Sequence, residues 1–264
     1  MARTSSAGAS IYWEEHGSGD PILLVMGLGA SLEAWDRIAP VLATRYRTIL
    51  FDNRGVGRSD VPPGPYSLEQ MADDAAAVMD AAGAPAAHVF GVSMGGMIAQ
   101  ELTLRHPARV RRLILGCTSC GGREAVRAEP EVIAALNARS TLPREQAMWS
   151  MAPYIYDEST PRARIEEDFK GRLSANGSNE GYAAQYDAIR AWKGTHARLA
   201  SVESPTLVIH GETDRLVPPD NGRVVARAIP GSRLVMLPRA SHIFLTDQHE
   251  AASAAILSFL QERS

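Results

Sequence analysis

A serine lies between two glycines in the run Gly91-Val92-Ser93-Met94-Gly95. The preceding residues, 87–92, have the apolar character of a buried strand, and a helical pattern follows, so this G-x-S-x-G motif occupies a strand-to-helix turn. Such a turn is tight enough that a side chain at position 91 or 95 would collide with backbone, which explains the two glycines. It holds the serine in a strained conformation with its hydroxyl exposed at the carboxyl edge of the sheet. The motif predicts that Ser93 is the nucleophile of an acyl-transfer reaction.

A serine hydroxyl is a weak nucleophile at neutral pH and needs a histidine as general base. Among seven histidines, His242 is favoured, because it follows the last strand-like run on a loop that leads into the final helix. His210, at the end of a buried strand, is the strongest alternative. The other five have simple structural explanations from their places in strands, helices or the interval described below: His16, His88, His106, His196 and His249.

The remaining parts of an acyl-transfer site are a carboxylate and two oxyanion donors. Asp214 follows the strand-like run 205–210 and is predicted to orient His242, with Glu212 as the weaker alternative. The first oxyanion donor should be the backbone N–H of Met94, directly after the nucleophile. The second is assigned to Leu28 N–H, since glycines on either side of Leu28 let that loop approach closely.

The elements that must position these residues are short apolar runs alternating with longer helical stretches. This alternation predicts an α/β fold with a mostly parallel sheet and helices on both faces. The strand-like runs are 10–15, 22–26, 48–52, 87–92, 110–116, 205–210 and 233–237. Helical spacing occupies 32–44, 67–82, 94–106, 220–228 and 248–263. Ser67, with Gln70 three residues later, predicts a capping box at the start of the second helix.

Residues 121–202 break the alternation, because they contain helical segments separated by prolines and no strand-like run. About eighty residues is too long for a loop in a compact domain. We therefore predict a helical cap at 121–202 inserted into a core formed by 1–120 and 203–264. Most of its aromatic residues should pack the cap onto the core, and a minority should face a pocket. These are Trp149, Tyr154, Tyr156, Phe169, Tyr182, Tyr186 and Trp192, which with Met148 and Met151 favour an apolar or aromatic substrate group.

Charge and composition argue against several other classes of protein. The net charge is −3, so no basic field exists to attract nucleic acid or anionic lipid. The longest apolar runs are too short to span a bilayer, and the first residues do not resemble a secretory signal, so we expect a cytoplasmic protein without membrane contact. Cys117 and Cys120 form a C-x-x-C pair without a second pair or a nearby histidine, which favours two ordinary thiols near a strand end over a redox or metal site. The sequence does not indicate the oligomeric state.

The chain resembles the α/β-hydrolase superfamily over its whole length, including the order serine, aspartate, histidine. The run 52–59 (D-N-R-G-V-G-R-S) resembles a loop that braces the site in relatives, so Asp52 and Arg54 are expected to be structural. The run 93–100 is most similar to 3-oxoadipate enol-lactonases and cofactor-free haloperoxidase-type esterases. One departure is the pair Met26-Gly27, where relatives often have His-Gly, which changes how the oxyanion loop is braced.

These observations favour hydrolysis of a small carboxylic ester or lactone through an acyl-enzyme, with no metal ion and no organic cofactor. Serine at position 93 argues against the dehalogenase and epoxide hydrolase chemistries, whose relatives use an aspartate nucleophile. One alternative is C–C bond hydrolysis of meta-cleavage type, whose anionic substrates would require arginines. Arg123, Arg190 and Arg198 are the candidates, although a surface role is favoured for each. The other alternative is a hydrolase-fold ligand receptor.

Overall fold

The computed structural model describes residues 2–174 and 178–262, which contain one sheet of eight strands in the order β1-β2-β4-β3-β5-β6-β7-β8. The strand β2 runs antiparallel to β1 and β4, and all other neighbouring strands are parallel. The strands are β1 (Ala2–Ser6), β2 (Ala9–His16), β3 (Pro21–Val25), β4 (Arg47–Phe51), β5 (Ala87–Val92), β6 (Val110–Gly116), β7 (Thr206–Gly211) and β8 (Arg233–Leu237). The predicted α/β fold with a mostly parallel sheet is confirmed.

Seven of the strands correspond to predicted runs, and β5, β6 and β8 have the predicted bounds. The eighth, β1, was not expected from the sequence. It lies at the outer edge of the sheet, where it pairs only with β2, and its residues alternate between half-buried and exposed. An edge strand of this kind contains no continuous apolar run, so hydrophobic patterning does not detect it.

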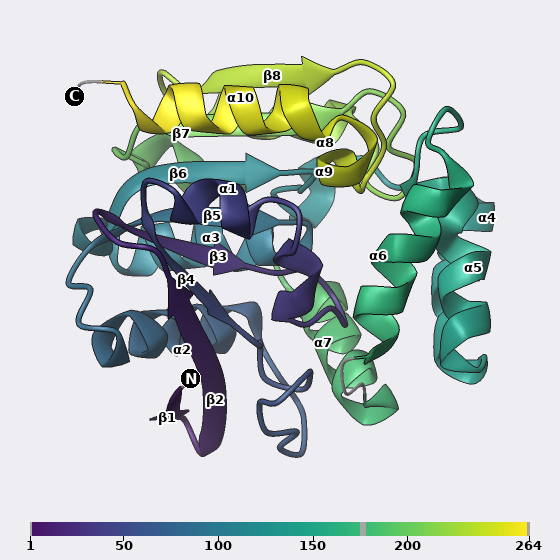
Figure 1. Ribbon diagram of the computed structural model, residues 1–264, viewed down its shortest axis with the longest axis horizontal. Coiled ribbons are helices and arrows are strands. Elements are labelled where there is room, and N and C mark those ends of the chain that lie inside the picture. Colours follow the sequence, from purple (N-terminus) through teal and green to yellow (C-terminus); the bar gives the residue numbers. More distant parts are fainter. Residues whose placement is uncertain (1, 175–177, 263–264) are drawn as a thin grey trace.

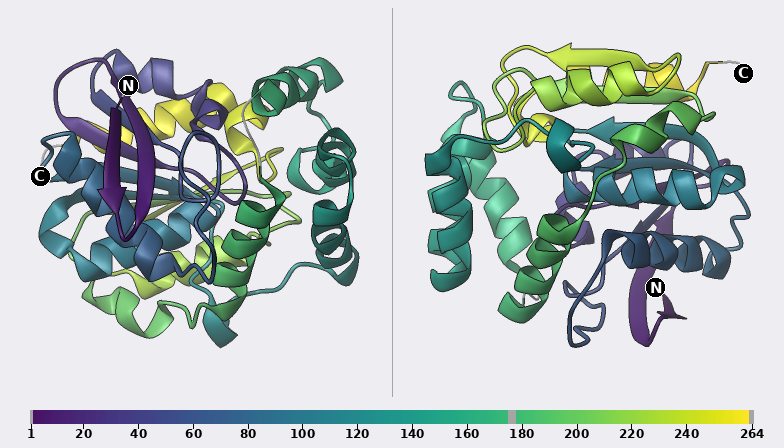
Figure 2. Two further views of the ribbon diagram at one scale, coloured as in Figure 1. Left: turned by 90° about the horizontal axis from the view of Figure 1, so that it is seen from below. Right: turned by 180° about the vertical axis from the view of Figure 1, so that it is seen from behind.

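Helices cover both faces of the sheet (Figures 1 and 2). These α-helices are α1 (Ala39–Ala43), α2 (Leu68–Ala81), α3 (Met94–Arg105), α8 (Asp220–Ala228), α9 (Phe244–Asp247) and α10 (His249–Leu260). On one face, α2, α3 and α8 enclose a core that includes Leu23 and Val89; on the other, α1 and α10 enclose a core that includes Leu24 and Phe90. Short 3-10 turns occupy Leu32–Trp35, Pro107–Arg109, Gly122–Glu124, Arg139–Thr141 and His196–Ser201. Within the described ranges, no helix is long and apolar enough to cross a membrane.

The helix ends follow local chemistry. Ser67 Oγ accepts a hydrogen bond from Gln70 N at 3.1 Å, so α2 begins where the capping pattern predicts. The predicted helix 32–44 is instead broken into a 3-10 turn and α1, because Pro40 has no N–H to continue an α-helix across residues 36–38. The predicted last helix, 248–263, corresponds to α10, and residue 263 lies outside the described residues; the short helix α9 before it was not predicted.

The interval between β6 and β7 contains four α-helices and, within its described residues, no strand. These cap helices are α4 (Pro130–Ala138), α5 (Arg144–Ile155), α6 (Arg162–Ser174) and α7 (Asn179–Ala191). They lie beyond the carboxyl ends of the parallel strands (Figure 1) and have a small apolar cluster of their own around Met151 and Phe169. The division of the chain into two domains at 121 and 202 stays a prediction.

Candidate active site

Ser93 is held in a sharp turn between β5 and α3, with φ 55° and ψ −124°. This backbone conformation is rare for a residue with a side chain and costs free energy. A Cβ at Gly91 would overlap the carbonyl of Gly95, and a Cβ at Gly95 would overlap the carbonyl of Val25. The turn is fixed by hydrogen bonds, because Ser93 N donates to Gly116 O at 2.9 Å and Thr118 Oγ1 donates to Ser93 O at 2.7 Å. The two glycines and the strained serine therefore have the geometry that the motif predicts.

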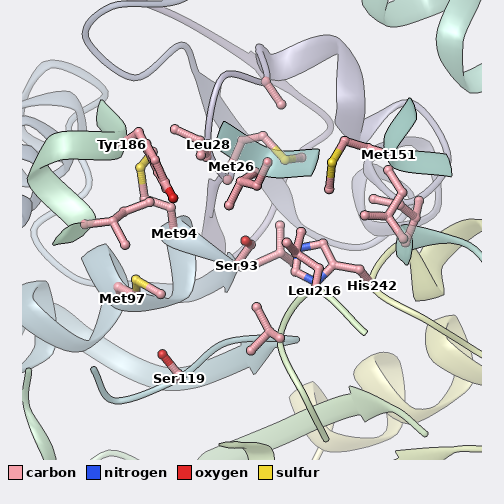
Figure 3. A pocket seen from close by; sticks show the side chains of 18 of the residues that line it. Met26, Leu28, Ser93, Met94, Met97, Ser119, Met151, Tyr186, Leu216 and His242 are labelled. Carbon is pink, nitrogen blue, oxygen red and sulfur yellow. The ribbon is translucent and has the colours of Figure 1, made fainter. Parts of the chain in front are cut away.

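His242 and Asp214 are hydrogen-bonded to each other. Nδ1 of His242 lies 2.9 Å from Asp214 Oδ2 and donates to it, and the imidazole is 9% exposed where it reaches the same cavity as Ser93. Figure 3 shows the Ser93 and His242 side chains close together in that cavity. Within the described residues no direct hydrogen bond joins them, and bonds of this kind often tighten only when substrate binds.

The carboxylate of Asp214 is buried in a site built for its ionised form. Its Oδ1 accepts hydrogen bonds from Leu216 N at 2.9 Å and Val217 N at 2.8 Å. Burial by itself would raise the pKa of Asp214, but the charge of His242 and hydrogen bonds from His210 and His242 outweigh burial and lower the pKa to about 2. The alternative acid, Glu212, is exposed. Asp214 is therefore ionised at any pH at which His242 could act as a base.

His210 also contacts Asp214, from the buried side. Its Nε2 lies 2.8 Å from Val217 O and 3.3 Å from Asp214 Oδ2. His210 is completely buried and does not line the cavity, so it has no access to a substrate. Of the histidines in the part of the chain that the structure describes, His242 alone lines the cavity.

The cavity has a volume of about 280 Å³ and lies between the cap helices and the carboxyl ends of the strands. Its lining is mainly apolar, with contributions from Met26, Leu28, Met97, Met151, Ile189 and Leu216 (Figure 3). Among the seven aromatic residues of the cap, Tyr186 lines it, whereas Trp192 donates from Nε1 to Glu101 at 2.8 Å and so anchors the cap on α3. Trp149, Tyr154, Tyr156 and Phe169 pack in an apolar cluster of the cap itself. The prediction that a minority face the pocket is therefore confirmed, whereas the prediction that most pack the cap onto the core is wrong.

The two predicted oxyanion donors, Leu28 and Met94, both line the cavity. Neither backbone N–H has a protein acceptor within the described ranges, so both are available to a ligand. A Cβ at Gly27 would lie 3.0 Å from Ser93 Cβ, and a Cβ at Gly29 would lie 2.6 Å from the Tyr182 ring. The glycines therefore allow the close approach that the sequence predicts.

The oxyanion loop is braced by groups outside it. Asn53 Nδ2 donates to Met26 O at 2.8 Å, and Gly29 N donates to the side-chain oxygen of Gln185 at 2.8 Å. Gln185 belongs to α7, is completely buried, and also donates to Arg54 O at 2.7 Å. It thus links the cap to two core loops. No sequence motif marks Gln185, which was not predicted.

Asp52 and Arg54 have the structural roles that the resemblance implies. Asp52 accepts from Leu32 N and from Arg58 N, both at 2.8 Å, and so holds two loops together. Arg54 forms a buried two-bond pair with Asp74, with both distances 2.6 Å. Neither residue lines the cavity.

Cys117 packs against the Asp214–His242 pair, closer to the site than the C-x-x-C spacing by itself indicates. One ligand atom from each of these three residues lies within 4.8 Å of the others, an arrangement that resembles a metal site. However, Asp214 and His242 already satisfy each other, and burial together with the charge of Asp214 raises the pKa of Cys117 well above its ordinary value. The thiol remains protonated and accepts from Gly211 N at 3.5 Å. It packs against the pair, and Cys120 is buried and free as well.

Two acids join the loops of the site to the cap. Asp247 accepts from Ser241 N at 2.7 Å, from Thr160 Oγ1 at 2.6 Å and from Asp157 N at 3.2 Å. Asp157 in turn accepts from Thr213 Oγ1 at 2.7 Å, directly before Asp214. Burial raises the pKa of Asp247 to about 6, although these hydrogen bonds oppose the shift. The residues that flank His242 and Asp214 are therefore attached to the α5–α6 connection.

The three arginines considered for anionic substrates do not line the cavity. Arg123 pairs with Glu124, Arg190 with Asp187, and Arg198 with the buried Glu101. Two other arginines do line it: Arg139, just after α4, and Arg172, in the last turn of α6. Neither was predicted, because helical spacing does not show which part of a cap helix faces the core.

The comparisons with known proteins agree with this geometry. Residues 20–248 match the family described as alpha/beta hydrolase fold. The RutD protein of Azorhizobium caulinodans, whose name describes a carbamate hydrolase, is 32% identical, with 99% of each chain covered. The 3-oxoadipate enol-lactonase 2 of Acinetobacter baylyi is 30% identical, over 87% of this chain and 84% of that protein. The crystal structure of the enol-lactonase from Burkholderia xenovorans LB400 aligns with a TM-score of 0.87 at 28% identity, over 99% of this chain and 100% of that chain. The chain belongs to the alpha/beta hydrolase fold family and to the group in it that includes these enol-lactonases.

Proposed function

We propose that this hydrolase cleaves a small carboxylic ester or lactone, with Ser93, His242 and Asp214 as its catalytic triad. The observation that supports this proposal best is the placement of Ser93 in a strained turn that opens onto the same cavity as His242, whose Nδ1 is bonded to Asp214. The enol-lactonase relatives support the lactone class by similarity.

In the proposed mechanism, His242 Nε2 removes the hydroxyl proton as Ser93 Oγ attacks the carbonyl carbon of the substrate. The charge that develops on the carbonyl oxygen is stabilised by the N–H groups of Leu28 and Met94, and by the N-terminus of α3. Protonated His242 then gives its proton to the leaving alcohol. Water, activated by the same imidazole, hydrolyses the acyl-enzyme, and Asp214 keeps Nδ1 protonated throughout.

The proposal is tested by measuring initial rates on p-nitrophenyl acetate, butyrate and octanoate, with wild type beside Ser93→Ala. Turnover by wild type that falls by roughly 10⁴-fold or more in Ser93→Ala is expected. A fluorophosphonate probe followed by peptide mass spectrometry should place the covalent label on Ser93.

Asp214→Asn is the second variant, because it leaves the shape intact while it favours the wrong tautomer of His242. We expect a loss of about 10⁴-fold in kcat. Undiminished turnover in Ser93→Ala or in a His242→Ala variant would overturn the assignment. If folded wild type turns over no ester or lactone, C–C bond hydrolysis and ligand reception become the functions to test.

A further inference from the structure

Two positive charges lie in the wall of the catalytic cavity. Arg139 and Arg172 both line it, and no aspartate or glutamate does so among the described residues. Both arginines are half-buried, and the remaining lining is mostly apolar. Two like charges in a partly desolvated cavity raise the free energy of the empty site unless an anion neutralises them.

Neither arginine has an ion pair elsewhere in the described ranges of the chain. The Arg139 guanidinium lies 4.9 Å from the centroid of the Tyr182 ring, which orients it without neutralising its charge. Burial lowers the pKa of Arg139, and the charges of Arg172 and Arg144 lower it further, as expected for cations gathered without an acid.

Two acids lie on the core side of this region, and one of them, Asp168, has other partners. Asp168 accepts from Arg37 Nε at 2.8 Å, from Thr246 Oγ1 at 2.6 Å and from Tyr156 OH at 3.0 Å. Asp36 and Arg172 line an adjoining cavity of about 50 Å³, but they do not form an ion pair. The charges of Arg172 and Asp36 interact across this adjoining cavity, but among the described residues no acid forms an ion pair with Arg172, so its guanidinium can pair with an anion in the catalytic cavity.

We infer that Arg139 and Arg172 form an anion subsite, and that the preferred substrate is an ester or lactone with a carboxylate group apart from the scissile bond. The inference rests on the proposed hydrolytic function. A guanidinium matches a carboxylate in shape and can donate two hydrogen bonds to it, which is why arginine suits this role. The cavity volume, about 280 Å³, restricts the substrate to a small molecule.

The test uses two pairs of esters, each with an anionic and a neutral member of the same size. On the acyl side the pair is p-nitrophenyl hydrogen adipate and its adipamate counterpart. On the alcohol side the pair is 4-carboxyphenyl butyrate and 4-carbamoylphenyl butyrate. The ratio of kcat/KM within each pair is measured for wild type, Arg139→Gln, Arg172→Gln and Arg162→Gln. Arg162 is the matched control, because it lies on α6 with Arg172 but is exposed and paired with Glu166.

We expect wild type to prefer the anionic member of at least one pair by about tenfold or more, as a charge-assisted hydrogen bond would give. Arg139→Gln and Arg172→Gln should bring the ratio of kcat/KM within that pair close to one, because they affect the anionic member more than the neutral member, and Arg162→Gln should retain the preference. Equal rates within both pairs for wild type, or an equal loss on both members in the variants, would overturn the inference. Arg172→Lys, which keeps the charge, should retain part of the preference.

Failure of the proposed function would be seen separately, as absence of turnover of the neutral esters. In that case, calorimetric titration of Ser93→Ala with adipate and with adipamide measures ligand binding to the subsite in the absence of catalysis. Binding of adipate that weakens about tenfold on adding Arg139→Gln supports the anion subsite. Absence of adipate binding, or equal binding of adipate and adipamide, contradicts it.

Discussion

His210 Nε2 lies 3.3 Å from Asp214 Oδ2, on the side of that carboxylate opposite the cavity. The same nitrogen lies 2.8 Å from Val217 O, and since a carbonyl only accepts, the proton of His210 must be on Nε2. Asp214 thus lies between two imidazoles: His242 Nδ1 donates to it, and the Nε2–H of His210, which donates to Val217 O, packs against its other side. His210 fixes the position of the carboxylate, and through it the orientation of His242.

Replacing His210 with Phe keeps a buried ring but removes the donor. We expect kcat to fall about tenfold with a smaller change in KM, because Asp214 becomes less well ordered. The unsatisfied Val217 carbonyl should lower the free energy of unfolding by about 1–3 kcal/mol. The measurement is kcat and KM on one p-nitrophenyl ester, with urea unfolding for stability. His88→Phe, at a buried histidine packed on Tyr46, is the control and should leave kcat unchanged.

The strained backbone of Ser93 predicts opposite effects of two small substitutions on stability. Both Ser93→Ala and Ser93→Gly remove the hydroxyl and should abolish turnover. Glycine accepts φ 55° without strain, whereas alanine does not, so Ser93→Gly should be more stable than Ser93→Ala by about 1 kcal/mol. Urea unfolding of the two variants measures the difference. Equal midpoints would show that the turn stores no strain.

Gln185 is predicted to affect catalysis from within the cap. Gln185→Leu removes the acceptor of Gly29 N–H and the donor to Arg54 O while nearly keeping the side-chain volume. We expect a loss of roughly 1–3 kcal/mol in stability from the buried groups left unsatisfied. The loosened loop should lower kcat about tenfold while KM changes little, since its proposed role is to stabilise charge in the transition state. Gln248→Leu is the control, because Gln248 bonds to Arg239 O outside the site. A change in KM alone would contradict this role.

Asp247 predicts a pH dependence of stability. Its pKa is about 6 in the folded chain, above the ordinary value of 3.8, so folding takes up a proton between about pH 4 and pH 6. The free energy of unfolding should therefore fall as pH rises through this window, by about 2 kcal/mol after allowance for partial exposure. Asp214 does not contribute there, because its lowered pKa removes stability only as pH falls from about 4 toward 2.

Asp247→Asn should flatten that slope. Urea midpoints at pH 4.5 and pH 7.5 for wild type and for Asp247→Asn measure it. Asp60→Asn serves as the matched control, since Asp60 is exposed and pairs with Arg3 at the sheet edge. An identical slope in Asp247→Asn and wild type would show that another group titrates.

Prediction from the sequence works best for residues whose positions are set by their chain neighbours. The turn at Ser93 is dictated by adjacent glycines, and Asp214 and His242 each follow a strand whose apolar run is evident. The sequence could not reveal Gln185, Arg139 or Arg172, because each belongs to the cap. A polar residue in a cap helix looks the same whether it faces solvent, a loop or a cavity, and only tertiary packing distinguishes these cases.

The break in the predicted helix 32–44 illustrates a second limit. The apolar spacing was correct, since Leu32, Trp35 and Leu42 are all buried. The prediction of one continuous helix was wrong because Pro40 has no backbone N–H to donate, which apolar spacing does not take into account. The missed strand β1 is a third case, because its hydrogen bonds to β2 hold it in place without an apolar run.

Three of the cap helices, α4, α5 and α6, share an apolar cluster, in which Met148, Met151 and Phe169 pack together apart from the two clusters that cover the sheet. A segment whose apolar contacts are mostly its own can diverge at its own rate. Recombination between related chains at the β6–α4 and α7–β7 connections would then exchange the compounds that the enzyme accepts, while the strands and the serine turn are inherited unchanged. Chimeras made at these two connections are consequently a practical route to new substrate ranges in this family.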